Sequence, residues 1–384
     1  MARWRPPWWF LRQTMEVIGG LLAANIGDVF NISIMALAIA YLNTHPETLA
    51  VLPGLAALRG SIYTSLSSRV STNLHLGVYK AEYRDVVEKE WANGVVLSFS
   101  SAILVGFLAG FLSGLSVSVT ITVSIISTAL SWMILMPGTA VLGVSFYRRN
   151  VDPDKVSAPV ITVLGDAVTI PSLVAASIMA THITHYPLAV TGLISIFILA
   201  VTVVLTLKKE TRVTFIQTMS SLIIVAIIES ITGAILAKWG ASKLNKEKLL
   251  PVYPSFLEDV GAVAAVVAAK TSTMSYLGTT GDKPYKFSLE ELILFIQSHI
   301  AIFPAMTIIT LINHVYTGAP LTESLLAIYT AALTVAFLGS LLSNILVKAT
   351  FRQEIDPDNV ILPLTTSITD LLGTIVLPLI AVIL

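Results

Sequence analysis

The sequence predicts an all-α polytopic membrane protein with eleven spans: two parallel five-helix repeats joined by one extra transmembrane helix. Three observations lead to this prediction. Hydrophobic residues make up 55% of the 384 residues, and charged residues only 12%. Apolar runs of about 20 residues, the length that crosses a hydrocarbon layer about 30 Å thick, follow one another to the end of the chain. Several short motifs also occur twice at a nearly constant offset, which indicates an internal repeat.

Four regions follow from the apolar runs. They are a cytoplasmic interfacial N-terminus at 1–12, a first five-helix repeat at 13–182, a linker helix at 183–212 and a second five-helix repeat at 213–384. The N-terminus is basic and rich in tryptophan, which is typical of an anchor at the membrane surface. The expected spans are 13–41, 53–77, 93–114, 118–147, 156–181, 187–207, 217–238, 254–278, 288–312, 322–347 and 359–384.

Lysine and arginine are distributed as the positive-inside rule requires if the N-terminus is cytoplasmic. Most of them fall in segments that this topology places inside. The outside loops hold four lysines, all between the seventh and eighth spans: Lys238, Lys243, Lys246 and Lys248. An odd number of spans then places the C-terminus outside. We therefore expect a multi-pass protein of the plasma membrane, surrounded by membrane lipids.

The repeat is clearest in one stretch that the chain uses twice. Residues 152–166 and 356–370 both begin with Asp-Pro-Asp, carry a proline at the same place and end in aspartate, at an offset of 204. Residues 69–72 match 270–273, and Gly77 matches Gly278, at an offset of 201. A repeat of five spans would be inverted relative to its neighbour if the two were joined directly. The linker helix adds one crossing and makes them parallel.

The two aspartates that end this stretch, Asp166 and Asp370, are the leading candidates for a cation site. Each lies about ten residues into an apolar span, roughly 15 Å deep at 1.5 Å per residue, where a carboxylate is costly and marks function. The hydroxyls of Thr162 and Thr366 lie one turn before them on the same helix face. Such oxygen ligands suit Mg²⁺ or Ca²⁺. The alternative is structural, with each aspartate paired to Arg69 or Lys270.

A second polar set lies in the first and seventh spans. Asn25, Asp28 and Asn31 share one face of the first span, and Glu229 occupies the corresponding part of the seventh. Asn25, Asp28 and Glu229 are candidates to line the same cation path. The alternative is hydrogen bonding between helices, which is common for such residues in membranes.

Arg59 lies near the start of the second span, and Glu258 and Asp259 stand just before its counterpart, Val260, in the eighth. The acidic pair is predicted either to collect cations at an external mouth or to form an ion pair with Arg59. The chain has no cysteine, its net charge is zero, and its histidines lack the spacing of a metal site. These features exclude disulfides and thiolate ligands, and they give no indication of nucleic-acid binding.

Two stretches carry a resemblance to a known family. Residues 52–72, LPGLAALRGSIYTSLSSRVST, resemble the second-helix motif of the MgtE-type magnesium transporters, particularly the two-repeat solute carrier family 41 branch. Residues 152–166, DPDKVSAPVITVLGD, resemble the fifth helix of that family, whose aspartate lies in the ion pore. The resemblance implies a Mg²⁺-permeable pore between two five-helix repeats, with Asp166 and Asp370 at the pore aspartate. The second helix of the family usually reads Gly-Asn, with a Glu nearby in the two-repeat branch. This chain departs from that pattern and has Ser61, Tyr63 and Ala262 at those places.

The function predicted from the sequence is therefore transmembrane transport of divalent cations, foremost Mg²⁺, by a protein that is not an enzyme. Two alternatives stay open. One is a Na⁺-coupled Mg²⁺ exchanger in place of a channel, with Na⁺ as a second ion. The other is an intramembrane enzyme. One chain supplies both repeats, so we expect a monomeric pseudo-dimer, with a homodimer as the open alternative.

Overall fold

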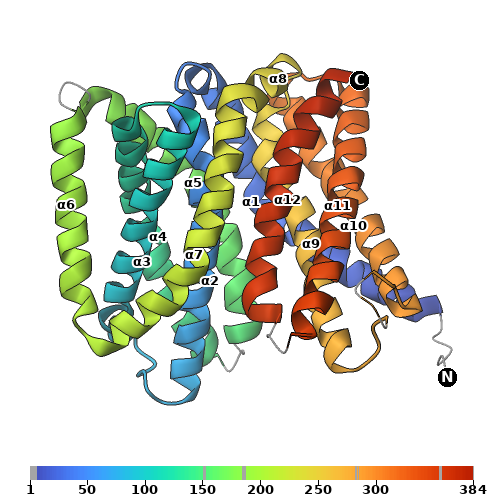
Figure 1. Cartoon of the computed structure of the whole chain (residues 1–384), viewed down its shortest axis with the longest axis horizontal. Helices are drawn as coiled ribbons and strands as arrows, with labels where there is room; N and C mark the ends of the chain where they lie inside the picture. Colours follow the sequence, from blue (N-terminus) through green and yellow to red (C-terminus); the bar gives the residue numbers. More distant parts are fainter. Residues whose placement is uncertain are drawn as a thin grey trace. The chain divides into compact units, whose positions relative to one another are not determined.

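The computed structural model describes residues 7–149, 153–183, 187–281, 283, 285–353 and 357–383, and every regular element in them is helical. Helices follow one another along the chain (Figure 1). In chain order they are α1 (Pro7–Leu42), α2 (Pro46–His75), α3 (Tyr83–Ser113), α4 (Val117–Arg148), α5 (Pro153–Ile183), α6 (Pro187–Thr206), α7 (Lys209–Ile235), α8 (Ala241–Lys246), α9 (Tyr253–Tyr276), α10 (Leu289–Thr317), α11 (Leu321–Phe351) and α12 (Pro357–Ile383).

Within the described residues, nine helices are long and apolar enough to cross a membrane. Two shorter apolar helices, Ala167–Thr181 and Gly192–Thr206, lie within α5 and α6. Helices satisfy their backbone groups internally, which is what a hydrocarbon layer demands of a spanning segment. The chain is an integral, multi-pass, all-α membrane protein.

Four of the described helices are followed by a glycine in the left-handed conformation, and these glycines recur between the two halves of the chain. Gly77 and Gly278 both adopt positive φ, 68° and 69°, just beyond α2 and α9. Gly114 and Gly318 do the same beyond α3 and α10, at 69° and 63°. Glycine enters this left-handed region without the penalty that a Cβ brings. The spacing within each pair is one of the two offsets seen in the sequence.

Several helices extend beyond the expected spans by more than a turn. The second span was expected to open at Pro53, but α2 begins at Pro46 and runs through Pro53. The third was expected to begin at residue 93, whereas α3 begins at Tyr83. Polar turns beyond the apolar stretch are helical too, because a helix can continue outside the hydrocarbon layer. The segment 236–246, which was expected to leave the helix at residue 238, continues α7 as a π-helical turn followed by α8.

The chain divides into two compact units, which we call unit 1 (Met1–Ala36 and Gly240–Leu384) and unit 2 (Leu37–Trp239). The opening helix of the first predicted repeat, α1, thus lies mainly in the unit that holds α9–α12. The opening helix of the second, α7, lies in the unit that holds α2–α6. The compact units therefore do not coincide with the repeat boundaries expected from the sequence, which stay a prediction.

In unit 2, α3 packs on α4, α4 on α5, and α7 on both α2 and α3. Small residues bring the backbones close. A Cβ built on Gly106 of α3 would lie 2.6 Å from Ile121 Cα of α4, and the Thr120 hydroxyl donates to the Gly106 carbonyl at 2.6 Å. Close approach at small residues and hydroxyl bonds across helices are the usual means of association in membranes.

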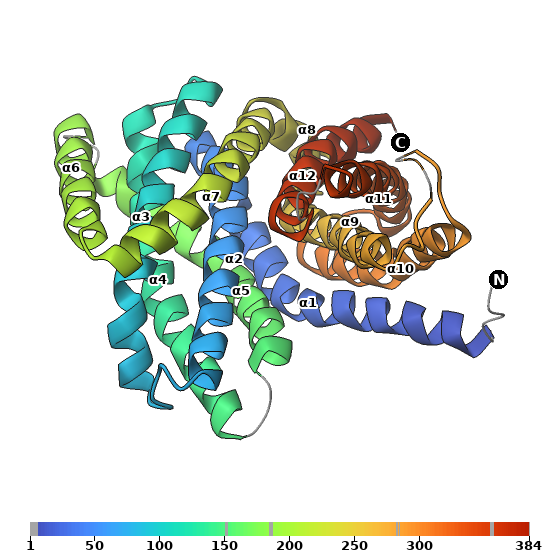
Figure 2. The ribbon, with the colours of Figure 1, turned by 60° about the horizontal axis from the view of Figure 1, so that its bottom comes forward.

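In unit 1, α9 packs against α11, α12 and α10, and α11 packs against α12. Figure 2 looks along these four helices and shows them gathered into a bundle. Tyr253 and Phe256 of α9 are among its largest fully buried side chains. Helix α1 reaches the bundle through a hydrogen bond from Gln297 of α10 to the Phe10 carbonyl, at 3.1 Å. This arrangement places the polar face of α1 against α9.

Candidate cation-binding site

Asp370 lies on α12 where that helix meets α9. A Cβ built on Gly261 of α9 would lie 3.6 Å from Asp370 Oδ1 and 3.9 Å from Thr366 Cβ. The side chains of Thr366 and Asp370, one turn apart, therefore both lie beside Gly261 of α9, as their spacing in the sequence predicts. A Cβ at Gly261 would be in ordinary van der Waals contact with the carboxylate. Thr374, one turn further on, donates its hydroxyl to the Asp370 carbonyl at 2.7 Å.

Asp166 and Thr162 belong to α5, but their side chains lie outside the described residues. Asp166 falls in unit 2 and Asp370 in unit 1. Their predicted pairing about a common axis therefore stays a prediction.

A second carboxylate cluster joins α1 to α9 within unit 1. The Asn25 amide nitrogen donates to Asp28 Oδ2 at 2.9 Å and to Asp259 Oδ2 at 3.1 Å. Asn31 of α1 and Ser255 of α9 lie beside the Asp28 carboxylate. Asp28 is 0% exposed and Asp259 is 1% exposed, so both acidic groups are removed from water. The structure brings together Asn25 and Asp28, as their shared helix face predicts, and adds Asp259.

Five buried oxygen atoms of this cluster have no hydrogen-bond partner within the described structure. They are Asn25 Oδ1, Asp28 Oδ1, Asn31 Oδ1, Ser255 Oγ and Asp259 Oδ1. A buried polar atom without a partner costs about 1–3 kcal/mol, and more if it is charged. The cluster is therefore rich in unused ligand atoms of one kind, hard oxygen.

Glu229 was expected to line the same path as Asp28. It lies on α7, in unit 2, and is fully buried together with Ser230 and Thr232. Its position in the interior agrees with a polar role inside the membrane. A path shared by Glu229 and Asp28 stays a prediction, because the two residues belong to different units.

Arg59 finds partners within unit 2. Its guanidinium donates to the Ser127 hydroxyl of α4 at 2.6 Å and to the Thr169 carbonyl of α5 at 3.4 Å. The side chain is buried. Asp259, one of its two expected partners, accepts a hydrogen bond from Asn25 within unit 1. The ion pair that the sequence suggested between them remains a prediction.

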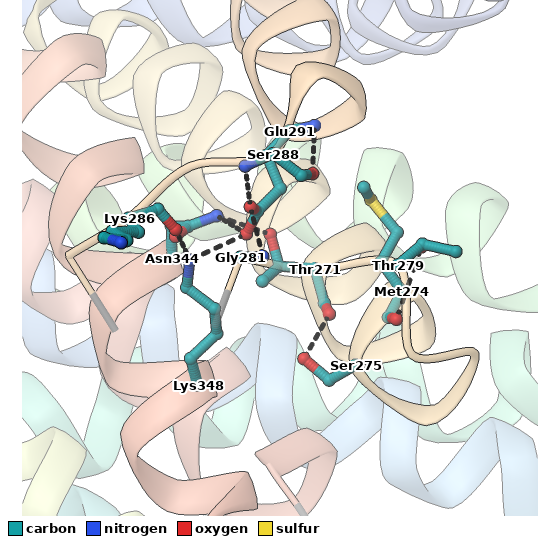
Figure 3. A network of polar contacts seen from close by, with 10 residues as sticks. All are labelled: Thr271, Met274, Ser275, Thr279, Gly281, Lys286, Ser288, Glu291, Asn344 and Lys348. Carbon is teal, nitrogen blue, oxygen red and sulfur yellow. Dashed lines mark hydrogen bonds and ion pairs between the residues drawn. The ribbon is translucent and has the colours of Figure 1, made fainter. Parts of the chain in front are cut away.

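Glu291, at the start of α10, shows what a fully satisfied carboxylate looks like in this molecule (Figure 3). Its Oε1 accepts from Lys348 at 2.9 Å and from Asn344 at 3.0 Å. Its Oε2 accepts from the backbone nitrogens of Ser288 and Gly281, at 2.6 Å and 3.0 Å. Ser288 completes a capping box with the Glu291 nitrogen. With a buried cation and three further donors, this carboxylate has no capacity for a metal ion, and it serves to join α10 to α11.

Glu90 of α3 occupies the matching position in unit 2, at the same offset of 201 from Glu291. It is ion-paired with Arg69 at 3.4 Å and accepts hydrogen bonds from Tyr79 and Asn93, both at 2.8 Å. Burial, together with the nearby Glu90 charge, raises the pKa of Tyr79, so the phenol remains a proton donor. Arg69 thus has a counter-ion in Glu90, which weakens the idea that its role is to neutralise a pore aspartate.

Across the described residues, no group of three or more histidine, aspartate or glutamate side chains is placed to hold a metal ion. A cation would therefore have to use carboxylates together with neutral oxygens. Sequence reasoning missed Asp259, Ser255 and Asn31 as members of one such set. Asn31 shares a helix face with Asp28 and could have been included. Asp259 could not, because nothing in the sequence indicates that α1 packs on α9.

Similarity to known proteins identifies the family of this chain. The family model MgtE, described as a divalent cation transporter, matches the chain twice, at residues 52–176 and 253–380. Solute carrier family 41 member 2 from Macaca fascicularis and from Homo sapiens are each 25% identical over 369 residues, which cover 87% of this chain. Solute carrier family 41 member 3 from Rattus norvegicus is 25% identical over 366 residues, covering 87% of this chain and 78% of its own.

The chain spans 63% of the length of the two member 2 relatives. No solved structure matches it. The two family matches together cover well over half of the chain and include both stretches on which the resemblance was based, which confirms that resemblance. The chain belongs to the MgtE family of divalent cation transporters.

Proposed function

We propose that this protein carries divalent cations, Mg²⁺ foremost, across a membrane along a path lined by Asp166 and Asp370. One observation carries the proposal. The family model matches the chain twice, and each match contains one of the two aspartates at the same distance before its end. Because the family is one of transporters, the intramembrane enzyme is no longer an alternative.

The chemistry of the path suits a hydrated ion. Mg²⁺ gives up its water reluctantly and is usually held by one or two carboxylates with water molecules between. Asp166 and Asp370 supply the charge, and Thr162 and Thr366 supply hydroxyls one turn away on the same helix faces. Asn25, Asp28 and Glu229 are further polar groups of the same path in this proposal.

The proposed architecture has eleven spans in two parallel repeats. The nine candidate spans and the two shorter apolar helices support this number. The paired positive-φ glycines support the repeat. In this proposal the N-terminus is cytoplasmic, the C-terminus is outside and the protein resides in the plasma membrane among its lipids. A single chain is the transport unit, and a homodimer is the alternative.

Transport is tested with the purified full-length chain in proteoliposomes that contain a Mg²⁺-sensitive dye. We expect Mg²⁺ uptake that exceeds that of protein-free vesicles and that does not require a Na⁺ gradient. Uptake only when a Na⁺ gradient is imposed would favour the Na⁺-coupled exchanger. No uptake of Mg²⁺, Mn²⁺ or Ca²⁺ under either condition would contradict the proposed function.

A further inference from the structure

The carboxylate cluster between α1 and α9 differs from Glu291, another buried carboxylate of unit 1. Asp28 and Asp259 share one amide, that of Asn25, so their Oδ2 atoms are no farther apart than the sum of two hydrogen bonds of 2.9 Å and 3.1 Å. Within the described residues, neither carboxylate has an ion-pair partner. By contrast, Glu291 in the same unit is paired with Lys348 and accepts three further hydrogen bonds.

The unsatisfied atoms of the cluster are all oxygens. The Oδ1 atoms of the two carboxylates, the Oδ1 atoms of Asn25 and Asn31, and the Ser255 hydroxyl are buried without a hydrogen-bond partner in the described structure. Asn31 is 4% exposed and Ser255 is 0% exposed, and both lie beside Asp28. Since Asn25 already donates to both carboxylates, its own carbonyl oxygen is left free to bind something else.

A proton or a cation could reduce this cost, and the two differ in how many oxygens they satisfy. A proton shared by the carboxylates would neutralise one charge and satisfy one further oxygen. A structural brace through Asn25 is already present and leaves five oxygens without a partner. A cation can be coordinated by several oxygens at once, and a divalent cation balances two carboxylates.

We propose that Asp28, Asp259, Asn25, Asn31 and Ser255 form a second cation site, which binds a divalent ion largely stripped of its water. The choice of a divalent ion rests on the proposed function. The position of the site rests on the buried oxygens. Because the side chains are almost closed to solvent, protein oxygens replace the water shell. Asp259 and Gly261 are two positions apart on α9, so they face different sides of it, and this site is distinct from the one beside Asp370.

Unit 2 lacks a carboxylate at the position of Asp259. In the repeat alignment, Asp259 matches Leu58 and its neighbour Val260 matches Arg59. The buried Arg59 guanidinium, held by Ser127 and the Thr169 carbonyl, thus lies next to the position that corresponds to Asp259. The helix that corresponds to α1 is α7, which carries the buried Glu229. The two halves therefore differ at Asp259, and the second site is proposed for unit 1.

The nature of the ligands sets a preference among ions. Mg²⁺ demands near-ideal octahedral geometry and loses water reluctantly, whereas Ca²⁺ accepts more flexible oxygen cages; carboxylate and carbonyl oxygens also suit Mn²⁺. We therefore expect the second site to bind Mn²⁺ or Ca²⁺ more tightly than Mg²⁺.

The site is tested by counting Mn²⁺ bound to the full-length chain in detergent, with electron paramagnetic resonance as the readout of free Mn²⁺. Asp28→Asn and Asp259→Asn should each bind one ion fewer per chain than the wild type. Ser255→Ala, a smaller change, should weaken this one binding event by about tenfold or more. Glu323→Gln, at the exposed start of α11, should bind as many ions as the wild type. Elution volume and melting temperature show that each variant is folded.

The proposal would be overturned if folded Asp259→Asn and folded Ser255→Ala bound as many ions as the wild type, with the same affinity. Infrared spectroscopy gives a second test. If the Mn²⁺-saturated wild type showed the carbonyl band of a protonated carboxyl group, and if Asp259→Asn lost that band, a proton would occupy the site and the proposal would be overturned. The liposome assay separates this result from the proposed function. If the wild type transports no ion and Asp259→Asn still loses one bound Mn²⁺, the site stands and the transport proposal fails.

Discussion

Glu291 accepts hydrogen bonds from Lys348, Asn344 and two backbone nitrogens, whereas the Oδ1 atoms of Asp28 and Asp259 have no partner in the described structure. This contrast separates two uses of a buried carboxylate. A carboxylate that is surrounded by donors is structural, because nothing remains with which to bind an ion. A pair of carboxylates with free oxygens is unfavourable until an ion arrives, and residues of this kind mark function inside a membrane.

The structural role of Glu291 gives a prediction for the pair that it forms with Lys348. Lys348→Met leaves a buried carboxylate without its cation and should lower the free energy of unfolding by about 3–5 kcal/mol. Glu291→Leu combined with Lys348→Met should cost clearly less than the sum of the two single changes, because no unpaired charge remains. Denaturation in detergent micelles measures all three. Strictly additive losses would show that the ion pair has no coupling energy.

At the scale of the helices, packing depends on small residues. Gly106 lets α3 approach the backbone of α4 so closely that a Cβ there would lie 2.6 Å from Ile121 Cα. The obstacle is backbone, which cannot move aside as the end of a flexible side chain can. Glycine at this place is therefore required by the contact between two helices and not by a turn.

Gly106→Val should consequently destabilise unit 2 by about 1–3 kcal/mol, the usual cost of overpacking. Gly192→Ala on α6 is the matched control, since a Cβ there meets no described atom within 4 Å. It should leave the stability unchanged or raise it by up to about 1 kcal/mol. Melting temperatures in detergent compare the two variants. Equal melting of Gly106→Val and the wild type would mean that α3 and α4 do not pack as described.

The sequence was sufficient to predict the helices, but not to predict which helices pack against one another. Apolar runs predict the presence and order of the long helices, because length and hydrophobicity are local properties. The early starts of α2 and α3 were missed, since helical turns outside the apolar layer leave no hydrophobic signal. Asp259 was assigned to Arg59 or to an external mouth. Its contact with Asn25 depends on α1 joining unit 1, which is a long-range property.

At the scale of the whole molecule, the proposed orientation can be tested without removing any native thiol, because the chain has no cysteine. A cysteine at Lys155 should react with an impermeant maleimide only after the cytoplasmic face is exposed. A cysteine at Lys246 should react from outside in intact cells. The charge bias of the loops is the physical reason for this expectation. Labelling of the Lys155 position from outside would reverse the proposed topology.

We propose that Asp166 and Asp370 act together on one transported divalent cation. Two nearby carboxylates repel each other unless a cation lies between them, and protons compete for the same oxygens as pH falls. Asparagine keeps the size of the side chain and removes the charge, so the fold should be retained.

The most direct measurement is the Mg²⁺ flux per folded molecule in proteoliposomes for Asp166→Asn, Asp370→Asn and the double variant. We expect each single change to remove most of the flux. The double variant should lose little more than either single one, because one shared site is already spoiled. Wild-type flux in either single variant, at an unchanged folded fraction, would contradict the account.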